Sequence, residues 1–176
     1  MVDLQGVVRS QYHAALDMLE AAIAACPDAV WDRPEDVNRT WQVAYHALFY
    51  THLYLQPTAA DFTPWERHRP HLQVFGDRLP WPPFEPVERG APLTKADVLD
   101  YVAVCRAEVD RRVADLDVDA PSGFDWLPMG KLEVQLYNLR HVMQHTGELY
   151  ERLGRAGADA LPWVGRGGAA VGDGTS

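Results

Sequence analysis

Histidine is the residue type in this chain whose spacing most directly suggests chemistry. Two of the seven histidines, His141 and His145, stand four positions apart. On an α-helix this spacing places two imidazoles on one face of adjacent turns, where both can reach one metal ion at about 2.0–2.1 Å. Val142 follows His141 in place of the glutamate that acts as general base in HExxH metalloproteases, so the sequence excludes that class. The other histidines are His13, His46, His52, His68 and His71.

Two of these histidines lie in a segment that is apolar all the way round. Residues 41–55 contain no Lys, Asp or Glu and carry large apolar or aromatic side chains on every side of the expected helix. A histidine there needs a metal or a hydrogen-bond partner, because an unpaired buried polar group is costly. His46 and His52 differ by roughly 120° around the helix, so both cannot readily bind one metal. Either one could be a third ligand, and either could be a core histidine bonded to a carbonyl or a tyrosine hydroxyl.

The residues around the histidines limit the class of metal site. A ferritin-type di-iron centre needs Glu three residues before a histidine on the same helix, and none of the seven histidines has one. A mononuclear site dominated by imidazole remains, which suits zinc, nickel or a related divalent ion. The alternative is that His141 and His145 face solvent, because they lie opposite an apolar row that includes Leu136, Leu139 and Met143.

Four segments with an apolar period of three to four residues predict the helices that would position these groups. They cover residues 4–26, 41–55, 94–116 and 131–153. Asn38 or Thr40 is a candidate cap for the second helix, Thr94 for the third, and Gly154 is expected to end the fourth. With no alternating strand pattern and no internal repeat, the sequence predicts an all-α four-helix bundle.

A long irregular segment separates the second and third expected helices. Residues 57–92 hold eight of the thirteen prolines and show no sustained period. Segments of this kind often act as lids or binding loops, so we expect this one to cover an opening in the bundle. Its aromatic residues predict that it packs down on the helices: Phe62, Trp65, Phe75, Trp81 and Phe84.

Length and charge limit the organisation and the partners of the chain. A chain of 176 residues with 47% apolar residues is long enough for one substantial core, which we place in residues 1–154. Residues 155–176 are expected to form a tail that docks around 161–164 and is disordered from Gly165 onward. The net charge of -9, with scattered Lys and Arg, argues against a nucleic-acid partner.

The first thirty residues and the two cysteines indicate the cellular location to expect. The start of the chain lacks a basic stretch followed by an apolar run, so we expect no signal peptide, no membrane span and a cytoplasmic location. Cys26 and Cys105 have no CxxC spacing, which fits buried reduced thiols better than a disulfide or a thiolate metal site.

Two segments carry a family resemblance, WQVAYHALFY at 41–50 and LEVQLYNLRHVMQHTGEL at 132–149. They resemble the DinB/YfiT-like superfamily of metal-dependent bundle proteins, and the resemblance extends to about Gly154. In that superfamily one histidine of the second helix and an HxxxH pair of the last helix bind the metal, which implies His46, His141 and His145 and favours His46 over His52. The resemblance also implies zinc or nickel completed by water, and a frequently homodimeric assembly.

The resemblance leaves several functions open. Characterised relatives include thiol-dependent transferases and isomerases and a hydrolase-like resistance protein, which implies a metal-dependent enzyme acting on a small molecule, with a low-molecular-weight thiol as a possible cofactor. Glu148, one turn beyond His145, is a candidate catalytic proton carrier or hydrogen-bond acceptor, although most helical glutamates are solvated. Tyr137 and Asn138 share the histidine face. The alternatives are a non-catalytic bundle that binds a small molecule or a metal, and a purely structural bundle.

Overall fold

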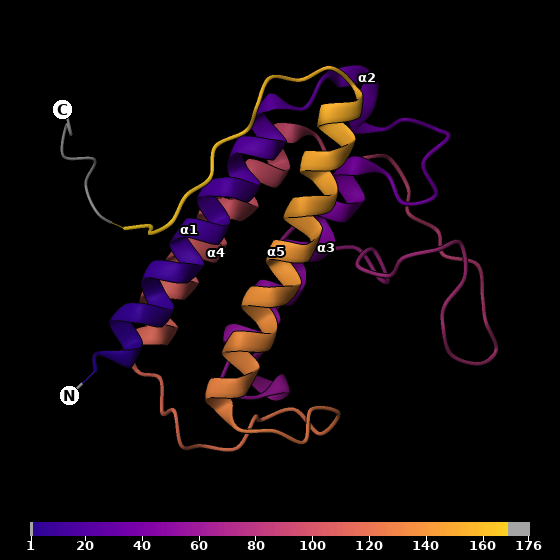
Figure 1. Cartoon of the computed structure of the whole chain (residues 1–176). Helices are drawn as coiled ribbons and strands as arrows, with labels where there is room; N and C mark the ends of the chain where they lie inside the picture. The colour runs from indigo at the N-terminus through magenta and orange to yellow at the C-terminus, as the bar shows by residue number, and fades with distance from the viewer. Residues whose placement is uncertain (1, 169–176) are drawn as a thin grey trace, which may run out of the picture.

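The computed structural model describes residues 2–168, and the regular structure among them is helical. Four long helices form the body of the protein: α1 (Leu4–Ala25), α3 (Thr40–Leu55), α4 (Lys95–Ala114) and α5 (Lys131–Arg155). Two short elements, α2 (Asp28–Trp31) and the 3-10 turn η1 (Ala59–Asp61), lie in the connections. Figure 1 shows the long helices packed side by side, which confirms the predicted all-α four-helix bundle.

The long helices pack as a ring. α1 and α3 each pack along both α4 and α5, whereas α1 and α3 touch each other only slightly across the bundle. Large aromatic side chains with no more than 2% exposure fill the centre: Trp41, Tyr12, Tyr45 and Tyr101. Because α3 has α5 on one flank and α4 on the other, its side chains can take part in two separate sites.

Hydrogen bonds between α3 and α5 show that these helices run antiparallel. The Gln135 side chain donates to the Tyr54 carbonyl, and Arg152 donates to the Asn38 carbonyl just before α3. Residue numbers therefore rise along α5 as they fall along α3. This register places the middle of α3 beside residues 141–145 of α5.

The face of α5 that packs into the bundle differs from the one that the sequence predicts. Its buried apolar positions are Val134, Val142, Leu149 and Leu153, and Gln135, Asn138, His145 and Thr146 share the same face. In the expected apolar row, Leu136 is 57% exposed, while Leu139 and Met143 are half-buried and pack against the core. Gln135 tolerates burial because its side chain donates to the Tyr54 carbonyl and accepts from the Tyr12 hydroxyl. His145 is 5% exposed and His141 is half-buried, so the alternative in which both histidines of α5 simply face solvent is wrong.

The expected helix ends are partly correct. Thr94 caps α4, since its hydroxyl accepts a hydrogen bond from the Asp97 N–H. α3 begins after Arg39, and neither expected cap acts on it: the Asn38 side chain accepts from the Gly76 N–H, while Thr40 is already helical. α5 continues past the expected stop at Gly154 by one residue.

The proline-rich segment between α3 and α4 has a part that contacts the bundle and a part that does not. Trp65 is buried, and Phe62 and Phe75 pack partly buried against the core. Trp81 and Phe84 are 45% and 51% exposed. Figure 1 shows part of this segment projecting away from the helices. The prediction that its aromatic residues pack on the bundle thus holds for three of the five and is wrong for Trp81 and Phe84.

The chain beyond α5 follows α1. The Gln11 side chain donates to the Gly165 carbonyl, and the Gly167 N–H donates to the Ser10 carbonyl. Gly165 and Gly167 are thus hydrogen-bonded to α1, and the disorder expected from Gly165 onward stays a prediction. The rest of that expectation, residues 169–176, lies outside the described residues.

Two further expectations concern membrane-spanning helices and the state of the two cysteines. None of the described helices has the length and apolar character needed to cross a membrane. Cys26 and Cys105 are both free and buried, as the sequence predicts. Burial raises the pKa of the Cys26 thiol to about 11, so this cysteine stays a protonated, unreactive thiol near neutral pH.

Candidate metal centre

Three histidine side chains from two helices meet where α3 packs against α5. His46 comes from the middle of α3, and His141 and His145 come from successive turns of α5. Each offers one ring nitrogen, and the three nitrogens lie within 4.8 Å of one another. The structure thus brings together the three residues that the sequence resemblance implies, in a group that could hold a metal ion.

His46 is held in one tautomer by a backbone carbonyl. Its Nδ1 lies 2.6 Å from the carbonyl oxygen of Gln73, which can only accept, so Nδ1 carries the proton. The Nε2 of the neutral ring keeps its lone pair and faces His141. Phe75 stacks on the His46 ring with centroids 3.9 Å apart. Residues 73–75 of the irregular segment therefore fix both the tautomer and the ring plane of His46.

His145 is held by a carboxylate on the next turn of α5. Its Nδ1 lies 3.2 Å from Oε2 of Glu148, and Arg152 donates to the other oxygen of the same carboxylate. The hydrogen bond from His145, together with the charge of Arg152, lowers the pKa of Glu148 in spite of its partial burial. An ionised carboxylate only accepts, so Nδ1 of His145 carries the proton and Nε2 is left for a ligand.

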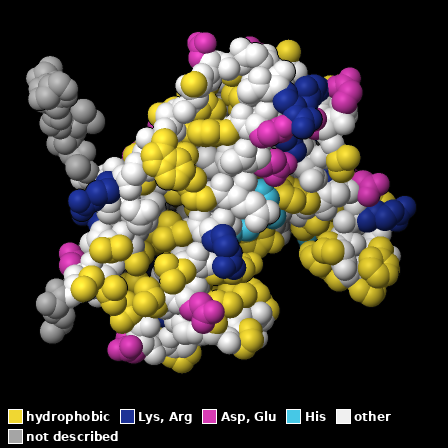
Figure 2. All heavy atoms as spheres, in the orientation of Figure 1, with side chains coloured by type: hydrophobic (Ala, Val, Ile, Leu, Met, Phe, Trp, Pro, Cys, Tyr) yellow, Lys and Arg dark blue, Asp and Glu magenta, His cyan; other side chains and the backbone are white. Residues whose placement is uncertain are grey.

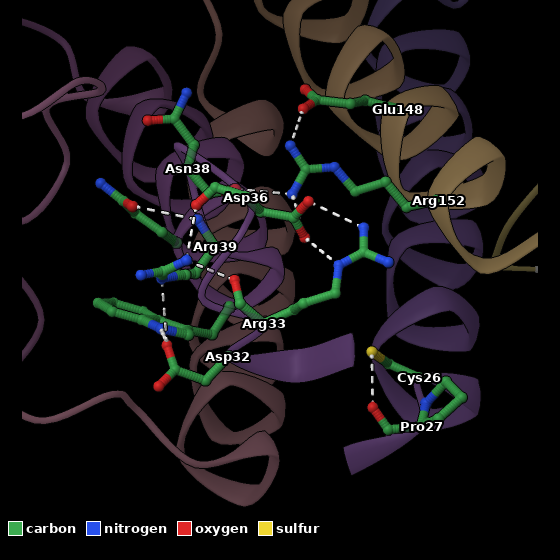
Figure 3. A network of polar contacts seen from close by, with 11 residues as sticks. Cys26, Pro27, Asp32, Arg33, Asp36, Asn38, Arg39, Glu148 and Arg152 are labelled. Carbon is green, nitrogen blue, oxygen red and sulfur yellow. Dashed lines mark hydrogen bonds and ion pairs between the residues drawn. The ribbon is translucent and has the colours of Figure 1, made fainter. Parts of the chain in front are cut away.

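Arg152 connects this carboxylate to the segment that precedes α3. Its Nη1 donates to the Asn38 carbonyl and lies 3.8 Å from Asp36, which in turn pairs with Arg33 at 2.8 Å. The side chains of Arg152 and Asp36 are each only 16% exposed. Figure 3 shows this series of alternating charges running from Glu148 to Arg33. This series of charges holds the Glu148 carboxylate in place through residues of α5 and of the connection that precedes α3.

His141 lies at a distance from His46 that suits a shared ion. Their Nε2 atoms are 3.1 Å apart, and two nitrogens bound to one tetrahedral metal at 2.0–2.1 Å are about 3.3 Å apart. Because Nε2 of His46 carries no proton, attraction across this gap needs a proton or a cation between the two atoms. Nδ1 of His141 is buried without a hydrogen-bond partner among the described residues. Three imidazole nitrogens form a donor set that fits zinc or a related divalent ion.

Burial keeps two of these imidazoles, those of His46 and His141, neutral. Removal from water lowers the pKa of His46 to about 3, more than the hydrogen bond to Gln73 raises it, and the two neighbouring histidines lower it further. Burial likewise lowers the pKa of His141 to about 4. Metal ligation needs the neutral ring, so near neutral pH protons compete weakly for these nitrogens.

His52, the other candidate on α3, belongs to a different site. Its Nδ1 lies 3.2 Å from the Tyr101 hydroxyl of α4, and its ring meets Phe62 edge-on. It lines an open cleft of about 650 Å³ on the α4 side of the bundle, together with Glu108 and Trp65. It is not part of the three-histidine group, which contains His46 instead.

The other residues on the expected histidine face have different surroundings. Asn138 is fully buried and donates to the Thr51 carbonyl, so it joins α5 to α3. Tyr137 is half-buried, and the guanidinium of Arg140 lies 5.5 Å from the centre of its ring. Of these two residues, only Tyr137 has surface available to a molecule that approaches the histidines.

Sequence reasoning missed three groups that shape the site. The Gln73 carbonyl is a backbone atom, and no residue type signals which carbonyl will meet a histidine. Phe75 lies in a segment without a period, so its position could not be derived. Arg152 could have been found, because it stands four residues after Glu148, the spacing of an ion pair along one helix face.

A histidine pair on the last helix and a third histidine on the second long helix define a class of helical-bundle proteins with three converging imidazoles that could hold a metal ion. The family model of the DinB superfamily matches residues 11–149, which is most of the chain. The chain belongs to the DinB superfamily, as its sequence resemblance predicts. Searches of curated proteins and of solved structures gave no match, so this assignment rests on the family model.

Proposed function

We propose that this protein binds one divalent metal ion through His46, His141 and His145 and uses it as an enzyme that acts on a small molecule. The observation that carries the proposal is the convergence of three imidazoles, two of which bond an acceptor through Nδ1 and so present Nε2. Hydrogen bonds of this kind accompany histidine ligands in protein metal sites, because they fix ring orientation and tautomer. Membership of the DinB superfamily supports the same site.

Zinc or nickel is the metal that we propose. Imidazole suits both ions, and three protein ligands are typical of catalytic sites that keep a coordination position open. A metal in this position would lower the pKa of a bound water or thiol toward neutrality and so supply a nucleophile. The three histidines bind, while the Gln73 carbonyl and Glu148 orient two of them.

We assign Glu148 a positioning role in preference to that of catalytic proton carrier. Both of its oxygens are engaged, one by His145 and one by Arg152. The same contacts lower its pKa, which makes its carboxylate a poor proton donor near neutral pH. Its contribution is then to hold His145 in the tautomer that a metal needs.

The proposed reaction is that of a thiol-dependent transferase or a hydrolase, with a low-molecular-weight thiol as cofactor in the first case. This class is the one that the sequence resemblance implies for characterised relatives. The alternative is a non-catalytic bundle that uses the same site to bind a small molecule or a metal. Turnover of thiol-containing or hydrolysable small molecules by the metal-loaded protein separates the two.

The assembly, location and boundaries remain part of the proposal. A partly exposed apolar row on α5 supports a homodimer, because its accessible surface is suited to burial against a second copy: Leu132, Leu136, Leu139 and Met143. The net charge of -9 supports the proposal that nucleic acid is not a partner. We also propose a cytoplasmic location, a bundle domain of residues 1–154 and a C-terminal tail of residues 155–176.

Elemental analysis of protein purified without an affinity tag tests the metal site. We expect about one zinc or nickel ion per chain in the wild type and none in the His141→Ala/His145→Ala double variant. His52→Ala is the matched control, because it removes a buried histidine of α3 that lies outside the group, and it should keep its metal. Metal retained by the double variant, or none in the wild type even after zinc and nickel are added back, would contradict the proposal.

A further inference from the structure

A continuous series of aromatic rings leads away from the three histidines along the seam between α3 and α5. Tyr50 lies 4.8 Å from His46 and 5.4 Å from His141, measured between ring centroids. From Tyr50 the series continues at centroid distances of 5.2–5.7 Å to the loop before α5. With Phe75, which stacks on His46, six side chains form what we call the aromatic strip: Phe75, Tyr50, Tyr54, Tyr137, Phe124 and Trp126.

Core packing explains only part of this strip. Tyr54 and Phe124 are 5% and 3% exposed and belong to the hydrophobic core. Tyr50 and Tyr137 keep part of their surface accessible, and Trp126 is 55% exposed. Figure 2 shows histidine side chains reaching the surface with hydrophobic side chains next to them. Accessible rings therefore lie next to the histidines, at Tyr50, and farther along the strip, at Tyr137 and Trp126, with buried rings between them.

The position of the strip links it to the metal site. Tyr50 contacts the rings of two of the three histidines, and Phe75 covers the ring of His46. A molecule whose head group binds at these histidines therefore lies next to these aromatic rings. Binding sites for small molecules commonly combine a few fixed polar groups with a wall of apolar and aromatic side chains, and this arrangement has both.

We propose that the aromatic strip binds the flat, aromatic part of a substrate whose polar head group is bound at His46, His141 and His145. The inference rests on the proposed metal site and adds a substrate class to it. Aromatic side chains bind a flat ring through stacked or edge-to-face contacts with centroids 4.5–7 Å apart, and these contacts add to the gain from burying apolar area. An aliphatic or strongly polar substituent gains less on such a surface.

Two hydroxamic acids with the same chelating head group test the inference on the zinc-loaded, full-length protein. Benzohydroxamate carries a phenyl ring where acetohydroxamate carries a methyl group, so their affinity ratio reports on the surface beside the metal. We expect benzohydroxamate to bind about tenfold more tightly by titration calorimetry. Cyclohexyl hydroxamate, which has equal bulk but is not flat, should bind less tightly than benzohydroxamate.

Variants identify the surface that produces this preference. Tyr50→Leu keeps an apolar side chain of moderate size but removes the ring, so the preference for benzohydroxamate should fall to about threefold or less while acetohydroxamate binds as before. Trp81→Ala is the control, because Trp81 is an exposed aromatic residue of the projecting segment and lies outside the strip. It should leave both affinities unchanged. Zinc content is measured in every variant.

The outcomes separate this inference from the metal site on which it rests. A wild-type chain that holds no zinc would overturn both. A chain that holds zinc but binds neither hydroxamate, or binds both equally, would overturn the role of the strip and leave the metal site standing. A preference for benzohydroxamate that survives Tyr50→Leu would likewise contradict it.

Discussion

His46 and His52 lie on the same helix six residues apart, yet they differ in what they can do. His46 faces α5, where His141 and His145 lie within reach of its ring. His52 faces α4, where the nearest partner of its Nδ1 is the Tyr101 hydroxyl at 3.2 Å. Burial lowers the pKa of both rings, so both are kept neutral. What distinguishes the two sites is the number of imidazoles that converge.

The comparison shows that the two histidines differ in what they meet across the helix interface and not in whether they are buried. Inside the bundle His52 can satisfy its polar atoms with a tyrosine hydroxyl, which is the ordinary solution for a core histidine. His46 uses the Gln73 carbonyl for one nitrogen and faces another histidine with the other. The second arrangement gains a strong stabilising partner only when a proton or a cation occupies the gap.

The largest difference should appear when each histidine of α3 is removed in turn. His46→Ala should weaken zinc binding by at least about 100-fold, because losing a ligand costs more than losing one of its outer hydrogen bonds. His52→Ala should leave the dissociation constant within about twofold of the wild type, since a factor of two is below 0.5 kcal/mol. Competition with a chromophoric chelator measures both constants. Equal losses in the two variants would remove the distinction between the sites.

Two glutamates, one beside each histidine site, give the next largest effect. Glu148→Ala should lower zinc affinity about 10–100-fold, the usual cost of removing the partner that orients a histidine ligand. Glu108→Ala is the matched change on the His52 side, where Glu108 pairs with Arg111 and Arg112. It should not alter zinc affinity. The same chelator competition measures the zinc affinity of both variants. A loss of affinity in Glu108→Ala as large as that in Glu148→Ala would contradict the positioning role assigned to Glu148.

The Tyr101 hydroxyl, which bonds His52, should affect the stability of the fold and not zinc binding. Tyr101→Phe removes the partner of His52 Nδ1 and should lower the free energy of unfolding by about 1 kcal/mol, the typical worth of one buried hydrogen bond. Urea unfolding followed by circular dichroism measures the change. Zinc content should remain that of the wild type, and loss of zinc in Tyr101→Phe would show that the two sites are coupled.

The smallest effect is a change in how stability depends on pH. Because burial lowers the pKa of His52 in the folded state, the unfolded chain binds more protons, and stability falls as the pH drops below about 6.5. A single histidine changes the slope by at most about 1.4 kcal/mol per pH unit. Metal-free His52→Gln should therefore show a shallower loss between pH 6.5 and 5 than the metal-free wild type, by urea unfolding. A steeper loss would mean that His52 is not held neutral.

The sequence predicts the helices closely because the apolar period directly reflects which residues pack inward. The expected first helix of residues 4–26 is α1 (Leu4–Ala25), and the expected last helix of 131–153 is α5 (Lys131–Arg155). The orientation of α5 could not be predicted in the same way. Its inward face contains Gln135 and Asn138, whose side chains bond carbonyls of α3 that only the assembled bundle supplies.

The histidine group was predictable to the extent that it rests on residue spacing and family resemblance. The pair at His141 and His145 follows from helix geometry, whereas the choice of His46 needed the resemblance, because apolar surroundings are common to both histidines of α3. The remaining parts of the site depend on tertiary contacts. Residues 73–75 reach His46 from an irregular segment, and no local pattern specifies where such a segment will return.

X-ray absorption spectroscopy of zinc-loaded, tag-free wild-type protein tests the central claim most directly, because it identifies the atoms bound to the metal. The three-histidine site predicts imidazole nitrogens at about 2.0–2.1 Å, with the outer-shell scattering typical of imidazole rings. This pattern should be unchanged in His52→Ala and lost in His46→Ala. A sulfur shell near 2.3 Å, or a shell of oxygen alone without imidazole scattering, would contradict the account.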